Sequence, residues 1–134
     1  MNKATDTVTK VDVPALVVEF INGYNNRNVD AMMACLTEDA IFENISNSHA
    51  AMVWKGIGAI RQLAEQSAAA FASRQQDIIR CVQEGDTIVL ELQFTGIPIV
   101  DLPNGMTAGN AAVLQGVSFI EMRDGKICKL RDFS

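Results

Sequence analysis

Residues 111–134, AAVLQGVSFIEMRDGKICKLRDFS, form the stretch of sequence that says most about the fold. Asp124 and Gly125 lie between two strand-like runs and predict a tight hairpin, because a two-residue turn needs positive φ angles. Along the final strand, side chains alternate between the two faces of the sheet. This alternation predicts one face made of Cys128, Leu130 and Asp132, and an opposite face made of Ile127, Lys129, Arg131 and Phe133.

Asp132 is the residue of this strand that most needs an explanation. Its carboxylate shares the predicted face with Cys128 and Leu130, and burying a carboxylate costs free energy unless it is paired, hydrogen-bonded or protonated. An acid in such a place is a candidate for proton transfer. The alternative interpretation is an aspartate near the chain end that is solvated or paired with a basic side chain, since structural ion pairs also perturb acids.

Length and composition predict one folded domain. The chain has 134 residues, of which 49% are hydrophobic and 20% charged, and this suits a single domain with a substantial core. We expect residues 1–11 to form a flexible polar tail and residues 12–134 to form the domain. The net charge of −5 argues against a nucleic-acid binder, which would carry a basic stripe. No apolar run approaches the roughly 18 residues of a spanning helix, and the N-terminus lacks a signal-peptide core, so we expect a cytoplasmic protein.

Residue types that bind metals are few. The three cysteines, Cys35, Cys81 and Cys128, are widely spaced and form no C-x-x-C motif, so neither a disulfide framework nor a zinc site is indicated. A single histidine cannot build a histidine-rich metal site, and the chain has no glycine-rich phosphate loop. We therefore expect no metal and no organic cofactor.

The order of hydrophobic patterns predicts an α+β fold. Apolar residues recur at helical spacing in three places: after Pro14, after Asn28, and again from Gly56 or Gly58 onward. Helices first and a strand meander later indicate helices packed on one face of a curved antiparallel sheet, with a pocket between the two layers. The open face of such a sheet needs a partner, so a homodimer is expected. Strand-like alternation occurs in residues 39–45, 75–83, 87–95 and 111–122 and after the Asp-Gly turn, with a loop at 46–49 and a long connection at 96–110.

Three segments carry a family resemblance: residues 24–44 (YNNRNVDAMMACLTEDAIFEN), 54–61 (WKGIGAIR) and 116–127 (GVSFIEMRDGKI). They resemble the nuclear transport factor 2-like superfamily, which includes SnoaL-like polyketide cyclases, ketosteroid isomerases and limonene epoxide hydrolases. The resemblance implies a cystatin-like roll: a cone-shaped, curved antiparallel sheet wrapped around a long helix, with two N-terminal helices. The superfamily contains many activities and many non-enzymes, so the fold alone does not define a reaction.

Two positions are similar to the limonene epoxide hydrolases. Asn44 matches that family's asparagine and Phe42 replaces its tyrosine, the two residues that hold the attacking water. Asp132, in a Leu-Arg-Asp-Phe sequence, matches the acid that activates the water. That family also carries an arginine and a second aspartate on the strand where this chain has Leu92 and Phe94 on the corresponding face, so protonation of an epoxide has no evident donor here.

The resemblance to ketosteroid isomerases is weaker. That family's general base falls at Asn44, its phenol donor at Phe20 and its neutral carboxylic acid near Ser118. Tyr24 lies one helical turn after Phe20 and could substitute for the phenol. SnoaL-like cyclases often have an aspartate where this chain has Ser118, and their acid–base work could pass here to Asp132.

The residues and the resemblance together predict a site centred on Asp132. Its carboxylate would act as general base or acid, and the amide of Asn44 would orient a water or a carbonyl oxygen. His49 could act near neutral pH or be an ordinary loop histidine, and Trp54 could cover the pocket or anchor its loop to the core. The predicted substrate-binding residues are Phe20, Tyr24, Phe42, His49, Trp54, Leu92, Phe94, Ser118 and Leu130.

These residues favour a SnoaL-like small-molecule enzyme that carries out isomerase- or cyclase-type proton transfer on a small hydrophobic substrate. The alternative is a non-catalytic ligand-binding or assembly module of the same fold, which the missing catalytic positions favour, so whether the chain is an enzyme stays open. A third hypothesis is an epoxide hydrolase-like protein with an incomplete catalytic set. The expected partners are a small hydrophobic molecule and a second copy of the chain, with no nucleic acid and no membrane.

Overall fold

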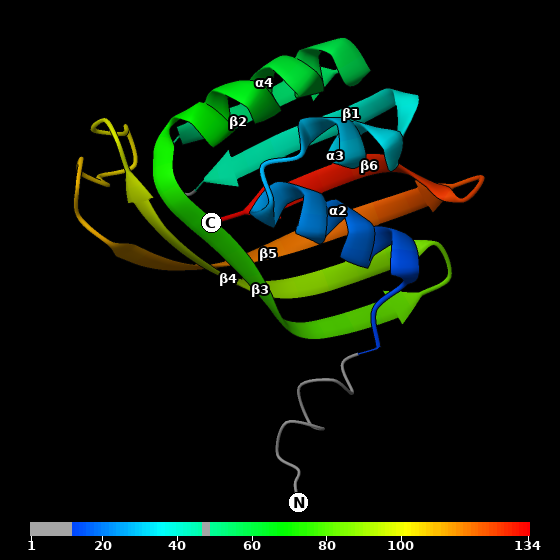
Figure 1. Ribbon diagram of the computed structural model, residues 1–134. Helices are drawn as coiled ribbons and strands as arrows, with labels where there is room; N and C mark the ends of the chain where they lie inside the picture. The colour runs from blue at the N-terminus through cyan, green and yellow to red at the C-terminus, as the bar shows by residue number, and fades with distance from the viewer. Residues whose placement is uncertain (1–11, 47–48) are drawn as a thin grey trace, which may run out of the picture.

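The computed structural model describes residues 12–46 and 49–134, and these form three helices and one six-stranded sheet (Figure 1). The predicted α+β class is confirmed, while the predicted tail at residues 1–11 lies outside the described residues. None of the described helices is long and apolar enough to cross a membrane. The elements are α2 (Ala15–Asn25), α3 (Val29–Ala34), β1 (Leu36–Ser46), β2 (His49–Lys55), α4 (Ile57–Ala69), β3 (Phe71–Glu84), β4 (Thr87–Pro98), β5 (Ala112–Arg123) and β6 (Lys126–Phe133).

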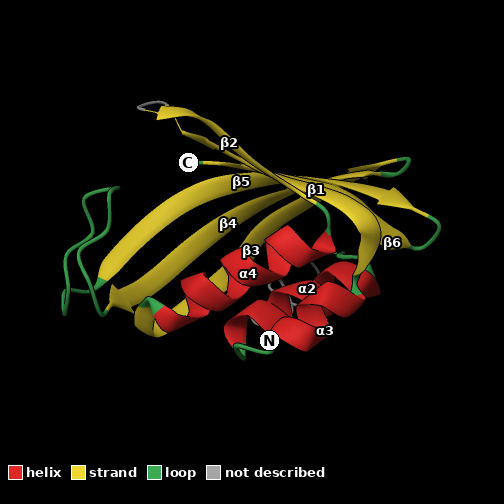
Figure 2. Cartoon of the chain, turned by 90° about the horizontal axis from the view of Figure 1, so that it is seen from above, coloured by secondary structure: helices red, strands yellow, loops and turns green. Residues whose placement is uncertain are grey.

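The sheet is curved and unclosed, with the strand order β2-β1-β6-β5-β4-β3. Neighbouring strands are antiparallel except β1 and β6, which pair in parallel. The last strand of the chain therefore lies in the middle of the sheet, between β1 and β5 (Figure 1). All three helices cover the same, concave face (Figure 2), so one layer of helices and one sheet enclose the core.

The core follows from the alternation of side chains along the strands. Ile88, Leu90, Ile120 and Ile127 are fully buried, and Val17 meets them from α2. Alternate residues of a strand point to one face, so the apolar set predicted for 87–95 faces the helices. Burial of each such side chain contributes about 1.5–3 kcal/mol to stability.

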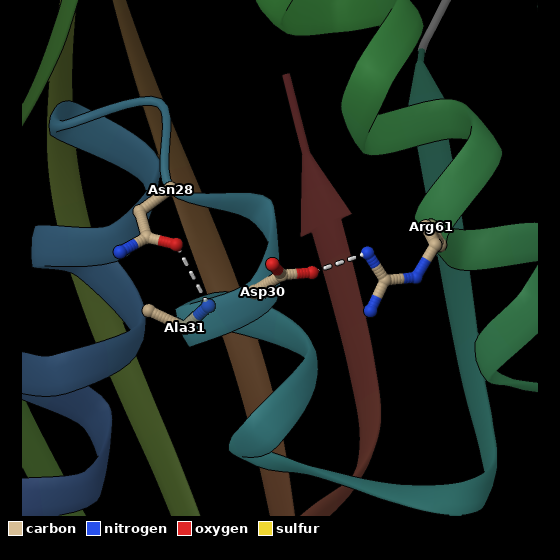
Figure 3. Close-up of polar contacts among 4 residues, drawn as sticks. All are labelled: Asn28, Asp30, Ala31 and Arg61. Atoms are coloured by element: carbon tan, nitrogen blue, oxygen red, sulfur yellow. Dashed lines mark hydrogen bonds and ion pairs between the residues drawn. The ribbon is translucent and has the colours of Figure 1, made fainter.

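Polar side chains at the start of α3 hold that short helix in place (Figure 3). The Asn28 side chain accepts a hydrogen bond of 3.1 Å from the backbone N–H of Ala31 and so caps the helix. Asp30, in the first turn, forms an ion pair of 2.7 Å with Arg61 of α4. Both partners are exposed, so this pair positions α3 against α4 and adds little stability.

Asn25 fastens the end of α2 to the edge strand β3. Its side-chain amide donates to the Gln76 carbonyl at 3.0 Å and accepts from the Gln76 N–H at 2.8 Å. Arg27 donates to the Phe71 carbonyl at 2.8 Å, at the beginning of the same strand. An edge strand has backbone groups without a strand partner, and here an asparagine side chain pairs with them.

Residues 49–55 are a strand, β2, that sequence analysis missed. β2 pairs with β1 in an antiparallel hairpin at the edge of the sheet, so the prediction that His49 lies in a loop is wrong. Residues 50–53 are exposed, and an edge strand of this kind has no buried face to impose alternation. The predicted strands at 39–45, 75–83 and 87–95 exist and are longer than expected, and the connection after β4 shortens to residues 99–111.

A β-bulge at Cys128 corrects the predicted faces of β6. Glu121 pairs with Lys129 and Met122 pairs with Ile127, so Cys128 is an extra residue opposite β5. Because of this extra residue, the side chains on the N-terminal side of the bulge point to the faces opposite to those that simple alternation predicts. Ile127 is accordingly fully buried and Cys128 is partly exposed, the opposite of the prediction, whereas Leu130 and Asp132 still face the helices.

The outer, convex face of the sheet carries apolar side chains. Phe119 stacks edge-on against Phe133 with ring centroids 5.5 Å apart, and Phe119 keeps 36% of its surface exposed. The homodimer that would cover this face stays a prediction. Further exposed apolar residues of the strands include Val53, Ile79, Val82 and Val113.

We expect Asn25→Ala to destabilise the fold by about 1–2 kcal/mol, because the change leaves the Gln76 N–H and carbonyl at the sheet edge without their partner. Asn26→Ala is the matched control, since Asn26 is exposed and its side chain is not what caps α2. Urea unfolding of both variants tests this. Equal stabilities of the two variants would show that the amide does not hold α2 to β3.

Candidate active site

A cavity lies between the concave face of the sheet and the helices α2 and α4, with a volume of about 100 Å³. Its wall is mainly apolar, with Phe20, Phe42, Ile120 and Leu130 among the lining residues. A site that is largely apolar and has a few convergent polar groups is typical of small-molecule binding. The polar side chains of the wall are those of Tyr24, Ser67, Arg74, Gln76, Ser118 and Asp132.

Asp132 faces this cavity from the central strand β6. Its register partners are Asn44 on β1 and Ser118 on β5, so the three residues form a row across the sheet. The Ser118 hydroxyl donates a hydrogen bond of 2.5 Å to Asp132 Oδ1. Asp132 keeps partial surface exposure as a residue, while its carboxyl group is removed from water. This desolvation raises the pKa of Asp132 from 3.8 to about 6, and the Ser118 hydrogen bond opposes the rise.

The basic neighbours of Asp132 in the sequence do not neutralise it. Arg131 and Lys129 lie on the other face of β6 and pair with Glu43, at 3.3 Å and 3.7 Å. Alternation along the strand separates these cations from Asp132 by the thickness of the sheet. Asp132 is thus an acid in an apolar cavity without an ion-pair partner among the described residues.

Asn44 lies beside Asp132 but outside the inner cavity. It is exposed, and it lines a second hollow of about 160 Å³ on the same concave face. Leu92 and Phe94 also line this second hollow. Ser118 and Asp132 belong to both hollows, so the Asp132 carboxyl group lies where they meet.

The other predicted site residues fall into two groups. Phe20, Tyr24, Phe42, Ser118 and Leu130 line the inner cavity with Asp132. Trp54 does not line it. Trp54 packs on Phe42 with ring centroids 5.4 Å apart, because the two residues are register partners on β2 and β1. His49 begins β2 opposite Ser46, and its role in the site stays a prediction.

Arg74 is the main residue of the cavity that sequence analysis missed. Only 6% of its surface is exposed. The guanidinium lies over the Tyr24 ring at 3.7 Å from the centroid, donates to Ser67 Oγ at 2.8 Å and donates to the Tyr24 carbonyl at 3.2 Å. The sequence FASRQQ around it shows no apolar alternation, so nothing local indicated that this arginine points inward.

Tyr24 supplies the cavity with a neutral phenol. Burial raises the pKa of Tyr24 above its ordinary value of 10.0, while the Arg74 guanidinium opposes the rise and the Asp132 carboxylate adds to it. A phenol that keeps its proton can donate a hydrogen bond to an oxygen of a ligand. No group of three metal-binding side chains occurs among the described residues.

A comparison with protein-family models identifies the family of this chain. The model of the SnoaL-like domain matches residues 17–130. The chain therefore belongs to the SnoaL-like domain family, and the predicted superfamily is confirmed. No curated protein matches the chain.

Solved structures share this fold at low sequence identity. A hypothetical protein from Catenulispora acidiphila with a ketosteroid isomerase-like fold, in complex with trimethylamine, superposes with a TM-score of 0.77 at 14% identity, over 92% of this chain and 87% of that chain. A candidate polyketide cyclase from Pseudomonas putida superposes with a TM-score of 0.71 at 21% identity, over 89% of this chain and 88% of that chain. An M. tuberculosis epoxide hydrolase of the limonene type superposes with a TM-score of 0.68 at 20% identity, over 88% of this chain and 78% of that chain. These similarities establish the fold.

We expect Asp132→Asn to stabilise the protein at neutral pH. The pKa of Asp132 is raised in the folded state, so the folded protein binds this proton more tightly than the unfolded chain, and ionisation disfavours folding as pH rises from about 4 to about 6. Above that window the penalty is about 3 kcal/mol. Differential scanning calorimetry should show a higher Tm for the variant at neutral pH and no gain near pH 4. An equal gain at both pH values would contradict the assigned pKa.

Proposed function

We propose that the protein is a cofactor-independent enzyme of isomerase or cyclase type that moves a proton on a small, hydrophobic carbonyl compound. One observation carries this proposal: the Asp132 carboxyl group faces a mainly apolar cavity and has no ion-pair partner among the described residues, and its pKa is raised to about 6. A carboxyl group with this pKa is ionised at neutral pH and is a stronger base than an exposed aspartate.

The proposed reaction uses three side chains of the cavity. Asp132 removes a proton from a carbon next to the substrate carbonyl and later returns it to another atom. The electrons of the broken C–H bond move onto the carbonyl oxygen, and the neutral Tyr24 phenol can donate a hydrogen bond to that oxygen. Ser118 holds the carboxylate in place through its hydrogen bond.

The two other hypotheses have less support from the site. Epoxide opening needs a second acid. In the hollow beside Asp132, the strand that would carry this acid presents Leu92 and Phe94 instead. A non-catalytic binding module is favoured by one observation: Asn44 is exposed and does not line the inner cavity, so the amide that was predicted to work with Asp132 is not there. The two experiments below separate this alternative from the enzyme.

The first experiment measures proton transfer directly. The protein is incubated in D₂O with a panel of cyclic ketones, enones and β-diketones, and deuterium incorporation is followed by mass spectrometry. We expect exchange into at least one compound, and Asp132→Asn should slow it roughly 10²–10⁴-fold. Asp86→Asn is the matched control, because Asp86 is exposed in the β3–β4 turn. A panel that binds without any exchange would identify a binding module.

The second experiment changes the pKa of the base. The Ser118 hydrogen bond lowers the pKa of Asp132, so Ser118→Ala should move the rising limb of the exchange rate against pH to higher pH while exchange persists. Ser73→Ala, at an exposed position of β3, should leave the profile in place. A profile that stays unchanged in Ser118→Ala would mean that a group other than Asp132 is the base.

A further inference from the structure

Arg74 is a buried cation for which the described part of the chain provides no anionic partner. It lies on β3 with 6% of its surface exposed, and it forms no ion pair with a carboxylate of the described residues. Buried charges in proteins are normally paired, because removing a charge from water costs free energy. The cavity wall therefore contains a positive charge that no carboxylate of residues 12–46 or 49–134 pairs with.

The partners that Arg74 does have are neutral. They are the Tyr24 ring, the Tyr24 carbonyl and the Ser67 hydroxyl. The guanidinium has five N–H donors, and its Nε is buried with no hydrogen-bond partner. Desolvation lowers the pKa of Arg74, Tyr24 opposes this change, and the nearby cation Arg27 adds to it. An anion placed against this guanidinium would relieve both effects.

Arg74 and Asp132 lie at separate places on the wall of the same cavity. Asp132 is on β6 and Arg74 is on β3, and two strands separate them in the sheet. The pKa of Asp132 is explained by desolvation and Ser118 alone, without a contribution from Arg74. Tyr24 contacts Arg74, its pKa responds to the Asp132 charge, and it lines the same cavity as both. One ligand can thus meet the base at one end and the cation at the other.

We propose that Arg74 binds a carboxylate group of the substrate, so that the substrate class is a small, apolar carbonyl compound that also carries one carboxylate. The assignment of the reacting end of this molecule rests on the proposed proton transfer. A single guanidinium in an otherwise apolar wall matches one negative charge, and its planar N–H groups match a carboxylate in shape. Tyr24 holds the guanidinium plane by stacking, which prepares it for that contact.

The test compares ligands that differ only in charge. Benzoate and benzamide, and cyclohexanecarboxylate with its amide, are titrated into the ¹⁵N-labelled protein and followed by NMR at neutral pH. The wild-type protein should bind each carboxylate at least about tenfold more tightly than its amide, with shifts at the amides of Ser67 and Gln76. Equal affinity for the two members of each pair would overturn the proposal without any variant.

Variants separate recognition from a purely structural role of Arg74. Arg74→Gln should abolish the carboxylate preference and leave benzamide affinity unchanged, whereas Arg74→Lys should keep part of the preference. If Arg74 has only a structural role, both variants should lose the same amount of affinity for the carboxylate and for the amide. Arg61→Gln is the matched control, because Arg61 is exposed on α4 and paired with Asp30. A preference that survives in Arg74→Gln would place the anion site elsewhere and overturn the proposal.

The same titration distinguishes this inference from the proposed reaction. Asp132→Asn removes the base and leaves Arg74 in place, so the carboxylate preference should persist while deuterium exchange is lost. A carboxylate preference in a protein that exchanges no carbonyl compound would refute the reaction and support the anion site. Exchange on neutral ketones without any carboxylate preference would support the reaction and refute the anion site.

Discussion

The parallel pairing of β1 with β6 is the constraint on which the rest of the structure depends. β1 and β2 form one antiparallel unit, and β3 to β6 form another, and only this pairing joins them into one sheet. It links residues about ninety positions apart in the chain, so its loop-closure entropy must be offset by the contacts it creates. These contacts include the row Asn44, Asp132 and Ser118. The pairing that completes the sheet is therefore also the one that brings Asn44 next to Asp132 in the candidate site.

The position of Asp132 in the middle of the sheet explains why its pKa is raised. A carboxylate on an edge strand would be hydrated, but strands on both sides and helices above exclude water from β6. Desolvation then disfavours the charged form. The protein tolerates this cost because Ser118 donates a hydrogen bond and because the rest of the core is apolar. The raised pKa of Asp132 therefore comes at the expense of stability, a trade-off that is common at functional sites.

The parts of the structure that sequence analysis predicted are those encoded by local patterns. The helices, the Asp124-Gly125 turn and the inward direction of Asp132 follow from periodicity and turn chemistry. Cys128 and Ile127 were placed on the wrong faces, because a bulge has no clear signature in a strand with mixed residues. β2 was missed because its exposed residues do not alternate. Arg74 was missed because its burial depends on α2 and α4, which contact it across long sequence separations.

The end of α2 couples the stability of the fold to the chemistry of the cavity. Tyr24 faces the cavity and Asn25, the next residue of the helix, binds the edge of β3. Arg74, on the same strand, reaches α2 and α4 together. These contacts determine how closely the helices approach the concave face and how well they exclude water. Because desolvation is what raises the pKa of Asp132, any loosening of α2 from β3 that admits water should lower that pKa toward its ordinary value.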